Sequence, residues 1–131
     1  MKNKKVVVTI CAFALVMLFS VTAFAGTAVF NNLKLPAGVI TYFGNSTKGN
    51  NTTFATLTVY SLSGLDMSWN VQFYNGSSWI NCTAEKYMSG NVSGSVNSSN
   101  YSPCPVPGTA MRTRALVGGT SDAYISGTIS Y

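Results

Sequence analysis

The chain has 131 residues, of which 47% are hydrophobic and only 8% are charged, and it contains no histidine. Its formal charge of +5 includes Lys2, Lys4 and Lys5 at the extreme N-terminus, so the rest of the chain carries a net charge of only +2. A chain with so few cations has no basic stripe that could neutralise several phosphates, and this argues against a nucleic-acid partner.

The first 25 residues have the three parts of a secretory signal peptide. The three lysines precede an apolar run from Val6 to Phe19, and Ala23-Phe24-Ala25 supplies small side chains at a cleavage site. Cleavage would leave residues 26–131 as a single secreted domain, without a transmembrane segment, because no second apolar run approaches the ~20 residues that a span requires. The alternative is an uncut leader that acts as an N-terminal anchor. The short lysine-rich leader is of bacterial type.

Apolar and polar residues alternate with a period of two along most of the remaining chain. Met67, Trp69, Val71 and Phe73 alternate with polar residues, as expected of a strand with one buried face. The same pattern predicts strands over residues 28–33, 39–43, 56–60, 67–73, 80–84, 111–117 and 123–131.

The connections between these segments carry turn residues. Asn75-Gly76 favours a tight hairpin turn, Gly118-Gly119 opens a turn before the last strand, and residues 89–102 form a long polar surface loop. Seven or eight short strands at regular spacing predict an all-β protein, an antiparallel β-sandwich in the first place and a small β-barrel as the alternative.

Cys82 and Cys104 are the two cysteines outside the leader. An even pair in an exported chain predicts one disulfide, which would contribute about 3.4 kcal/mol through closure of the intervening loop. Because there is no CxxC spacing and no histidine, we expect neither a metal site nor a redox role, and no cofactor.

The sequence offers little catalytic chemistry. Without histidine there is no Ser/His or Cys/His pair, and the acids Asp66, Glu85 and Asp122 each lie at a predicted turn or strand end. We therefore expect a non-enzymatic protein with no catalytic residues.

Four aromatic residues fall on the polar face of their predicted strands. Tyr60, Tyr74, Trp79 and Tyr124 would form a platform beside Asn, Gln and Ser side chains, suited to a sugar ring or to an apolar patch of a partner. The alternative is that these rings are ordinary packing. Arg112 and Arg114 share one strand face and could contact anionic wall polymer or lipid headgroups, or simply lie in solvent.

The order of several features resembles a diffuse group of small secreted β-sandwich proteins of Gram-positive bacteria, with lactococcin 972-like bacteriocins at its periphery. The matching segments cover most of residues 26–131: Phe30 with Leu35-Pro36, Thr47-Lys48 before Ala55, and Arg112-Thr113-Arg114-Ala115 followed by Tyr124-Ile125-Ser126-Gly127-Thr128. The chain departs from the bacteriocins in its cysteine pair and in Tyr131 as its sole C-terminal aromatic residue. The resemblance implies a β-sandwich fold and export, and it carries no catalytic signature.

Three functions follow as expectations. The first is a secreted interaction module that acts at a cell envelope or another extracellular surface, in the manner of a bacteriocin or otherwise, with a wall polymer, glycan or envelope protein as partner. The second is a carbohydrate-binding module, and the third is a structural surface or matrix component. The sequence leaves the ligand and the oligomeric state open.

Overall fold

The structure is a computed structural model that describes residues 26–49, 52–63, 66–90 and 93–131. The expected signal peptide, residues 1–25, lies outside these ranges. The described residues form nine β-strands, and the pairs between them are all antiparallel. The strands are β1 (Thr27–Leu35), β2 (Ile40–Thr47), β3 (Thr56–Ser63), β4 (Met67–Tyr74), β5 (Trp79–Asn81), β6 (Lys86–Met88), β7 (Gly94–Asn97), β8 (Ala110–Val117) and β9 (Ala123–Ser130).

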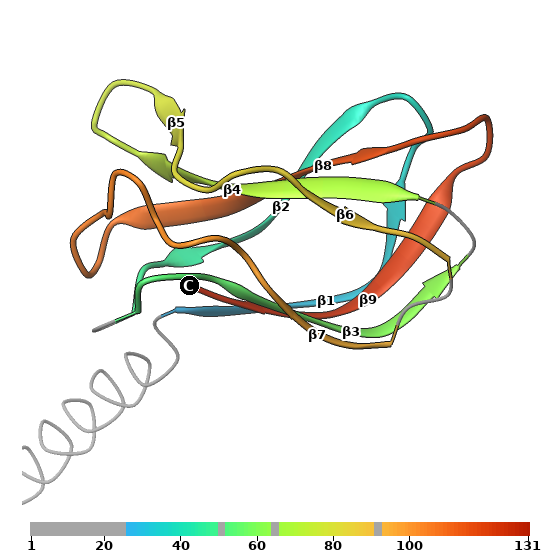
Figure 1. The fold of residues 1–131 in the computed structure, drawn as a ribbon, viewed down its shortest axis with the longest axis horizontal. Coiled ribbons are helices and arrows are strands. Elements are labelled where there is room, and N and C mark those ends of the chain that lie inside the picture. Colours follow the sequence, from blue (N-terminus) through green and yellow to red (C-terminus); the bar gives the residue numbers. More distant parts are fainter. Residues whose placement is uncertain (1–25, 50–51, 64–65, 91–92) are drawn as a thin grey trace, which may run out of the picture.

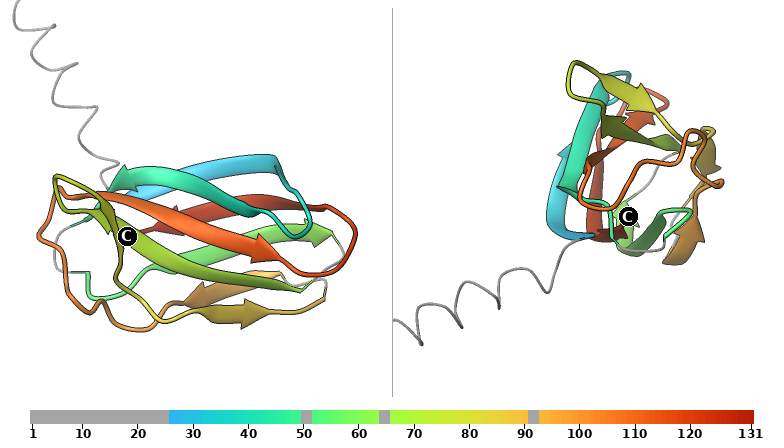
Figure 2. Two further views of the ribbon diagram at one scale, coloured as in Figure 1. Left: turned by 90° about the horizontal axis from the view of Figure 1, so that it is seen from above. Right: turned by 90° about the vertical axis from the view of Figure 1, so that its left-hand side faces the viewer.

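These strands form two sheets that lie in two layers (Figures 1 and 2). The first sheet has the order β1-β9-β3-β7, and the second has the order β2-β8-β4-β5 with β6 also paired to β4. The chain passes repeatedly from one sheet to the other, since β1 and β3 belong to the first sheet and β2 and β4 to the second. The predicted all-β class is confirmed, and the arrangement is sandwich-like, with nine strands where seven or eight were expected.

The core lies between the sheets and is built by the predicted alternation. Met67, Trp69 and Val71 of β4 are fully buried, and alternate residues of β8 and β9 are buried with them. One hydrogen bond crosses the core between the hydroxyls of Thr113 and Tyr131, which lie 2.8 Å apart. The period-two pattern therefore determines which face of each strand is inside.

Strand β9 lies in the middle of the first sheet, between β1 and β3. At its centre Gly127 pairs with Phe30 on one side and Val59 on the other. A Cβ atom at this glycine would overlap the carbonyl oxygen of Thr58. The close approach of β3 to β9 therefore requires a residue without a side chain at position 127.

The hairpin between β4 and β5 forms at the predicted turn. Gly76 has a φ of 97°, and the Asn75 side-chain oxygen accepts hydrogen bonds from the backbone N–H groups of Ser77 and Ser78 at 2.9 Å. These contacts fix Trp79 directly opposite Tyr74.

Two short strands were not predicted. β7 lies inside the segment expected to be a loop and is held against β3, where Thr58 and Ser95 share a hydrogen bond. The predicted strand over residues 80–84 ends at Asn81, and the chain re-enters the sheet only at β6. Thr83, in the connection between β5 and β6, is buried, and its hydroxyl accepts a hydrogen bond from the Val71 N–H at 2.8 Å.

The predicted disulfide between Cys82 and Cys104 is wrong, since both cysteines are free and are not at disulfide distance. The Cys82 thiol is buried and points to the Val71 carbonyl oxygen 3.5 Å away, whereas Cys104 is exposed. The two segments are joined instead by a backbone hydrogen bond of 2.7 Å from Ser102 to Cys82. Pairing of the segments thus needs no covalent link.

The close contact at Gly127 predicts a selective loss of stability. We expect Gly127→Ala to lower the free energy of unfolding by about 3 kcal/mol, because the added methyl group forces β3 away from β9. Thermal denaturation measures this effect. Gly118→Ala is the matched control, since a Cβ there meets only an ordinary contact at 3.6 Å. Equal melting temperatures of the two variants would contradict the prediction.

The two cysteines should differ in reactivity. Burial raises the pKa of the Cys82 thiol to about 12, so that it is protonated and inert at neutral pH, whereas Cys104 is exposed. Alkylation with iodoacetamide at pH 8, mapped by mass spectrometry, should label Cys104 in the folded protein and Cys82 only after denaturation. Recovery of a linked Cys82–Cys104 peptide would refute the free-thiol arrangement.

Candidate functional site

The outer face of the second sheet is organised by the pairing of β4 with β8. Residues at alternate positions point away from the core, and the register sets Arg112 opposite Gln72 and Arg114 opposite Asn70. On the flanking strands, Tyr42 of β2 pairs with Arg114, and Asn81 of β5 pairs with Gln72. Four strands thereby contribute side chains to one surface.

Arg112 is the centre of this surface. Its Cζ atom lies 3.8 Å from the centre of the Tyr42 ring and 4.2 Å from the centre of the Trp79 ring. Its Nε donates a hydrogen bond of 2.9 Å to Gln72, whose amide nitrogen donates at 2.8 Å to Asn81. We call Tyr42, Gln72, Tyr74, Trp79 and Arg112 the Arg112 cluster.

The guanidinium of Arg112 covers one face of each neighbouring ring. An atom this close to a ring centre must lie above the ring plane, because an in-plane approach would overlap the ring atoms. The Trp79 ring also packs against Tyr74, with centroids 5.5 Å apart and planes inclined by 51°. Cation–π contacts and ring packing therefore hold the cluster in place before any partner arrives.

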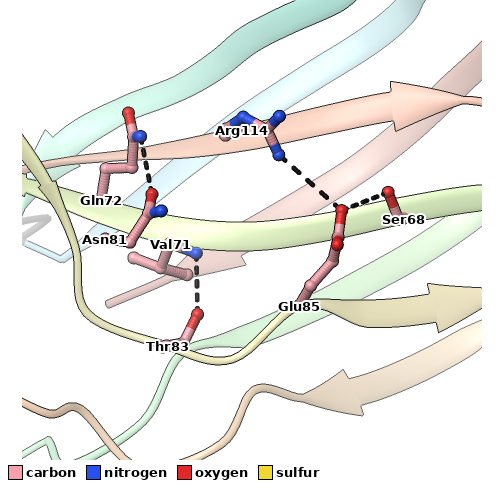
Figure 3. Close-up of polar contacts among 7 residues, drawn as sticks. All are labelled: Ser68, Val71, Gln72, Asn81, Thr83, Glu85 and Arg114. Carbon is pink, nitrogen blue, oxygen red and sulfur yellow. Dashed lines mark hydrogen bonds and ion pairs between the residues drawn. The ribbon is translucent and has the colours of Figure 1, made fainter.

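A second group of polar contacts lies further along the same face (Figure 3). Glu85 accepts a hydrogen bond of 2.6 Å from the Ser68 hydroxyl, and the same carboxylate oxygen lies 3.7 Å from Arg114 Nη1 (Figure 3). The Glu85 charge is thus partly balanced by Arg114. Arg112 has no acidic partner among the described residues.

The polar residues of β4 on this outer face are buried by their neighbours. Ser68, Asn70 and Gln72 are each less than a tenth exposed, and Asn70 is only 4% exposed. Ser68 and Gln72 have the partners described above, whereas the Oδ1 atom of Asn70 has no hydrogen-bond partner within the described residues. The longer side chains of the neighbouring strands therefore form the actual surface above β4.

The six predicted surface residues do not lie together. Tyr74, Trp79, Arg112 and Arg114 share the outer face of the second sheet, whereas Tyr60 in β3 and Tyr124 in β9 belong to the first sheet. The single platform of four aromatic rings is therefore wrong. The prediction that the rings are exposed holds for Tyr60, Tyr74 and Tyr124, while Trp79 is half-buried.

Sequence reasoning missed Tyr42, the second ring on Arg112. In the structure Tyr42 is exposed and the next residue, Phe43, is buried. In the sequence, however, large apolar or aromatic residues occupy both odd and even positions of this segment: Val39, Ile40, Tyr42 and Phe43. The pattern therefore gives no clear inner and outer face there.

A shallow hollow of about 240 Å³ lies at the other end of this face. It is lined by Gly38, Asp66, Ser68, Tyr87, Leu116, Val117, Gly118 and Gly119. Tyr87 pairs with Ser68 and is 79% exposed. The outer face thus has an aromatic residue at both ends.

Two of the acids, Glu85 and Asp122, have structural partners rather than one another. Asp122 pairs with Lys34 at 2.9 Å and accepts a hydrogen bond from the Ala37 N–H, and these contacts lower the pKa of its carboxyl group. In the part of the chain that the structure describes, no group of three His, Cys, Asp or Glu residues could hold a metal ion. Nor does any helix within those ranges have the length and hydropathy to cross a membrane.

Comparison with protein-family models, curated proteins and solved structures gave no match to this chain.

Removal of the Arg112 guanidinium should expose Trp79. The chain has two tryptophans, and Trp69 is fully buried, so quenching of fluorescence by acrylamide reports mainly on Trp79. We expect Arg112→Ala to increase the quenching constant and to lower the free energy of unfolding by about 1 kcal/mol. Arg114→Ala is the control, and it should leave the quenching unchanged. Identical quenching in both variants would show that Arg112 does not cover Trp79.

Proposed function

We propose that this chain is a secreted, non-enzymatic interaction module that binds a cell envelope or another extracellular surface. The binding surface is the Arg112 cluster and its surroundings on the outer face of the second sheet. The proposal that the chain is exported is supported by the signal-peptide pattern of residues 1–25. The resemblance to the bacteriocin group suggests antagonism toward other bacteria as one form of this role.

The observation that carries the proposal is the convergence of Tyr42, Trp79 and Arg112 on one partly exposed face. Tyr, Trp and Arg are enriched at the centres of binding interfaces and among the residues that dominate binding energy. The cluster is also preorganised, because Gln72 holds the Arg112 Nε. A surface that is already ordered loses less entropy when it binds.

The location of the acids supports a non-enzymatic role. Glu85 directly precedes β6 and bonds to Ser68 of the second sheet, while Asp122 follows β8 and binds Lys34 of β1. These two carboxylates therefore each stabilise their own part of the fold. A paired-carboxylate mechanism would require two such groups to face a common substrate.

A carbohydrate-binding module is the second candidate. Tyr74 is 40% exposed and packs against Trp79, and the Asn81 amide lies on the neighbouring strand. Stacking of a sugar on Tyr42 or Trp79 is less favourable, because Arg112 already covers one face of each ring.

Sedimentation with isolated Gram-positive cell walls tests the proposal. We expect saturable binding of the wild-type protein and at least a tenfold loss of affinity in Trp79→Ala, while this variant remains folded. Tyr60→Ala is the matched control, since Tyr60 is 64% exposed on the other sheet. Competition by a free neutral sugar would favour the second candidate. Absence of wall binding, or equal loss in both variants, would contradict an envelope role of this face.

A further inference from the structure

Two charged residues on the outer face of the second sheet are separated from one another: Asp66 lines the hollow at one end, and Arg112 lies beside Trp79 at the other. Glu85 is engaged by Ser68 and Arg114, and the other described ion pair, Lys34 with Asp122, involves the first sheet. Lys48 is buried, with its Nζ 5.8 Å from the centre of the Tyr101 ring. Within the described part of the chain, Arg112 is thus a cation without a counter-ion at the centre of the proposed binding surface.

The surroundings of Arg112 restrict what it can bind. The centres of two aromatic rings lie within 4.2 Å of its Cζ atom, and its Nε is already bonded to Gln72. No hydrogen bond joins either terminal nitrogen to another described residue. A guanidinium held in this way offers its terminal N–H groups, whose fork matches the two oxygens of a carboxylate or phosphate.

The neighbouring aromatic rings favour the same kind of ligand. The edge of an aromatic ring is electropositive and its face is electronegative. Because Arg112 covers one face of Tyr42 and of Trp79, an anion that binds its terminal nitrogens approaches these rings at their edges. Arg114 lies two residues further along β8 on the same side, about 7 Å away, and can contact a second anionic group.

We propose that the Arg112 cluster recognises an oxyanion group, a phosphate or a carboxylate, carried by an anionic extracellular polymer, with Arg112 as the specific contact and Arg114 as a second electrostatic contact. This inference rests on the proposed function and names the ligand class of the same surface. Binding of an anion replaces the water at the terminal nitrogens of Arg112 without rearrangement of the cluster, since Gln72 and the two rings already fix the side chain.

The test measures binding of the purified chain to three probes by isothermal titration calorimetry. Sodium polyphosphate represents phosphate, poly-L-glutamate represents carboxylate, and dextran is the neutral control. We expect binding to at least one polyanion, weakening as salt is raised, and no binding to dextran. The polyanion that binds with the higher affinity identifies which oxyanion the surface prefers.

Substitution of Arg112 separates specific recognition from net charge. Arg112→Lys keeps the charge but loses the fork and should lower the affinity for the polyanion about tenfold, whereas Arg114→Lys should lower it less than threefold. Tyr60→Ala should bind like the wild type. Unchanged affinity in Arg112→Lys, preferential binding of dextran, or no binding of any probe would overturn the proposal.

The wall sedimentation experiment distinguishes failure of the ligand class from failure of the proposed function. If walls bind and Trp79→Ala abolishes this binding, but Arg112→Lys binds walls normally, the surface is functional and the oxyanion ligand is wrong. If the polyanion binds through Arg112 and walls do not, the oxyanion site stands and the envelope role is wrong.

Discussion

The register between β4 and β8 is the constraint on which the rest of the structure depends. These strands pair without a bulge from Met67 opposite Val117 to Phe73 opposite Met111. Because side chains alternate along each strand, this one register buries Trp69 and Thr113 and at the same time sets Arg112 opposite Gln72 outside. A shift by a single residue would exchange the core and the outer face together.

Much of the fold was predictable because its long strands alternate regularly. The inner residues of β4, β8 and β9, and the turn at Asn75-Gly76, follow directly from local pattern. β7 was not predictable, since Gly94-Ser95-Val96-Asn97 has little intrinsic strand preference and is held by hydrogen bonds to β3. The disulfide of Cys82 is predicted from the even number of cysteines and the oxidising compartment, whereas the direction of its thiol toward the Val71 carbonyl depends on where β5 ends.

The candidate site was predictable only in part, for a different reason. Alternation shows whether a ring points outward, but it does not show on which sheet the strand lies. Tyr60 and Tyr74 belong to the consecutive strands β3 and β4, and both fall on the polar face of their strand. They nevertheless lie on separate sheets, because β3 and β4 pair with different partners. The reach of Arg112 across to Tyr42 and Trp79 is likewise a property of side-chain packing between three strands, and no local pattern encodes it.

The place of β9 has a consequence for the order in which the molecule can assemble. β9 follows every other described strand along the chain, yet it joins β1 to β3 at the centre of the first sheet. Until residues 123–130 pair with them, β1 and β3 each have an edge with unpaired backbone groups. The contacts between β1 and β9 that close the sheet join residues from the two ends of the described chain. Folding that depends on such distant contacts is slow, so the chain must spend time with these edges open to other strands.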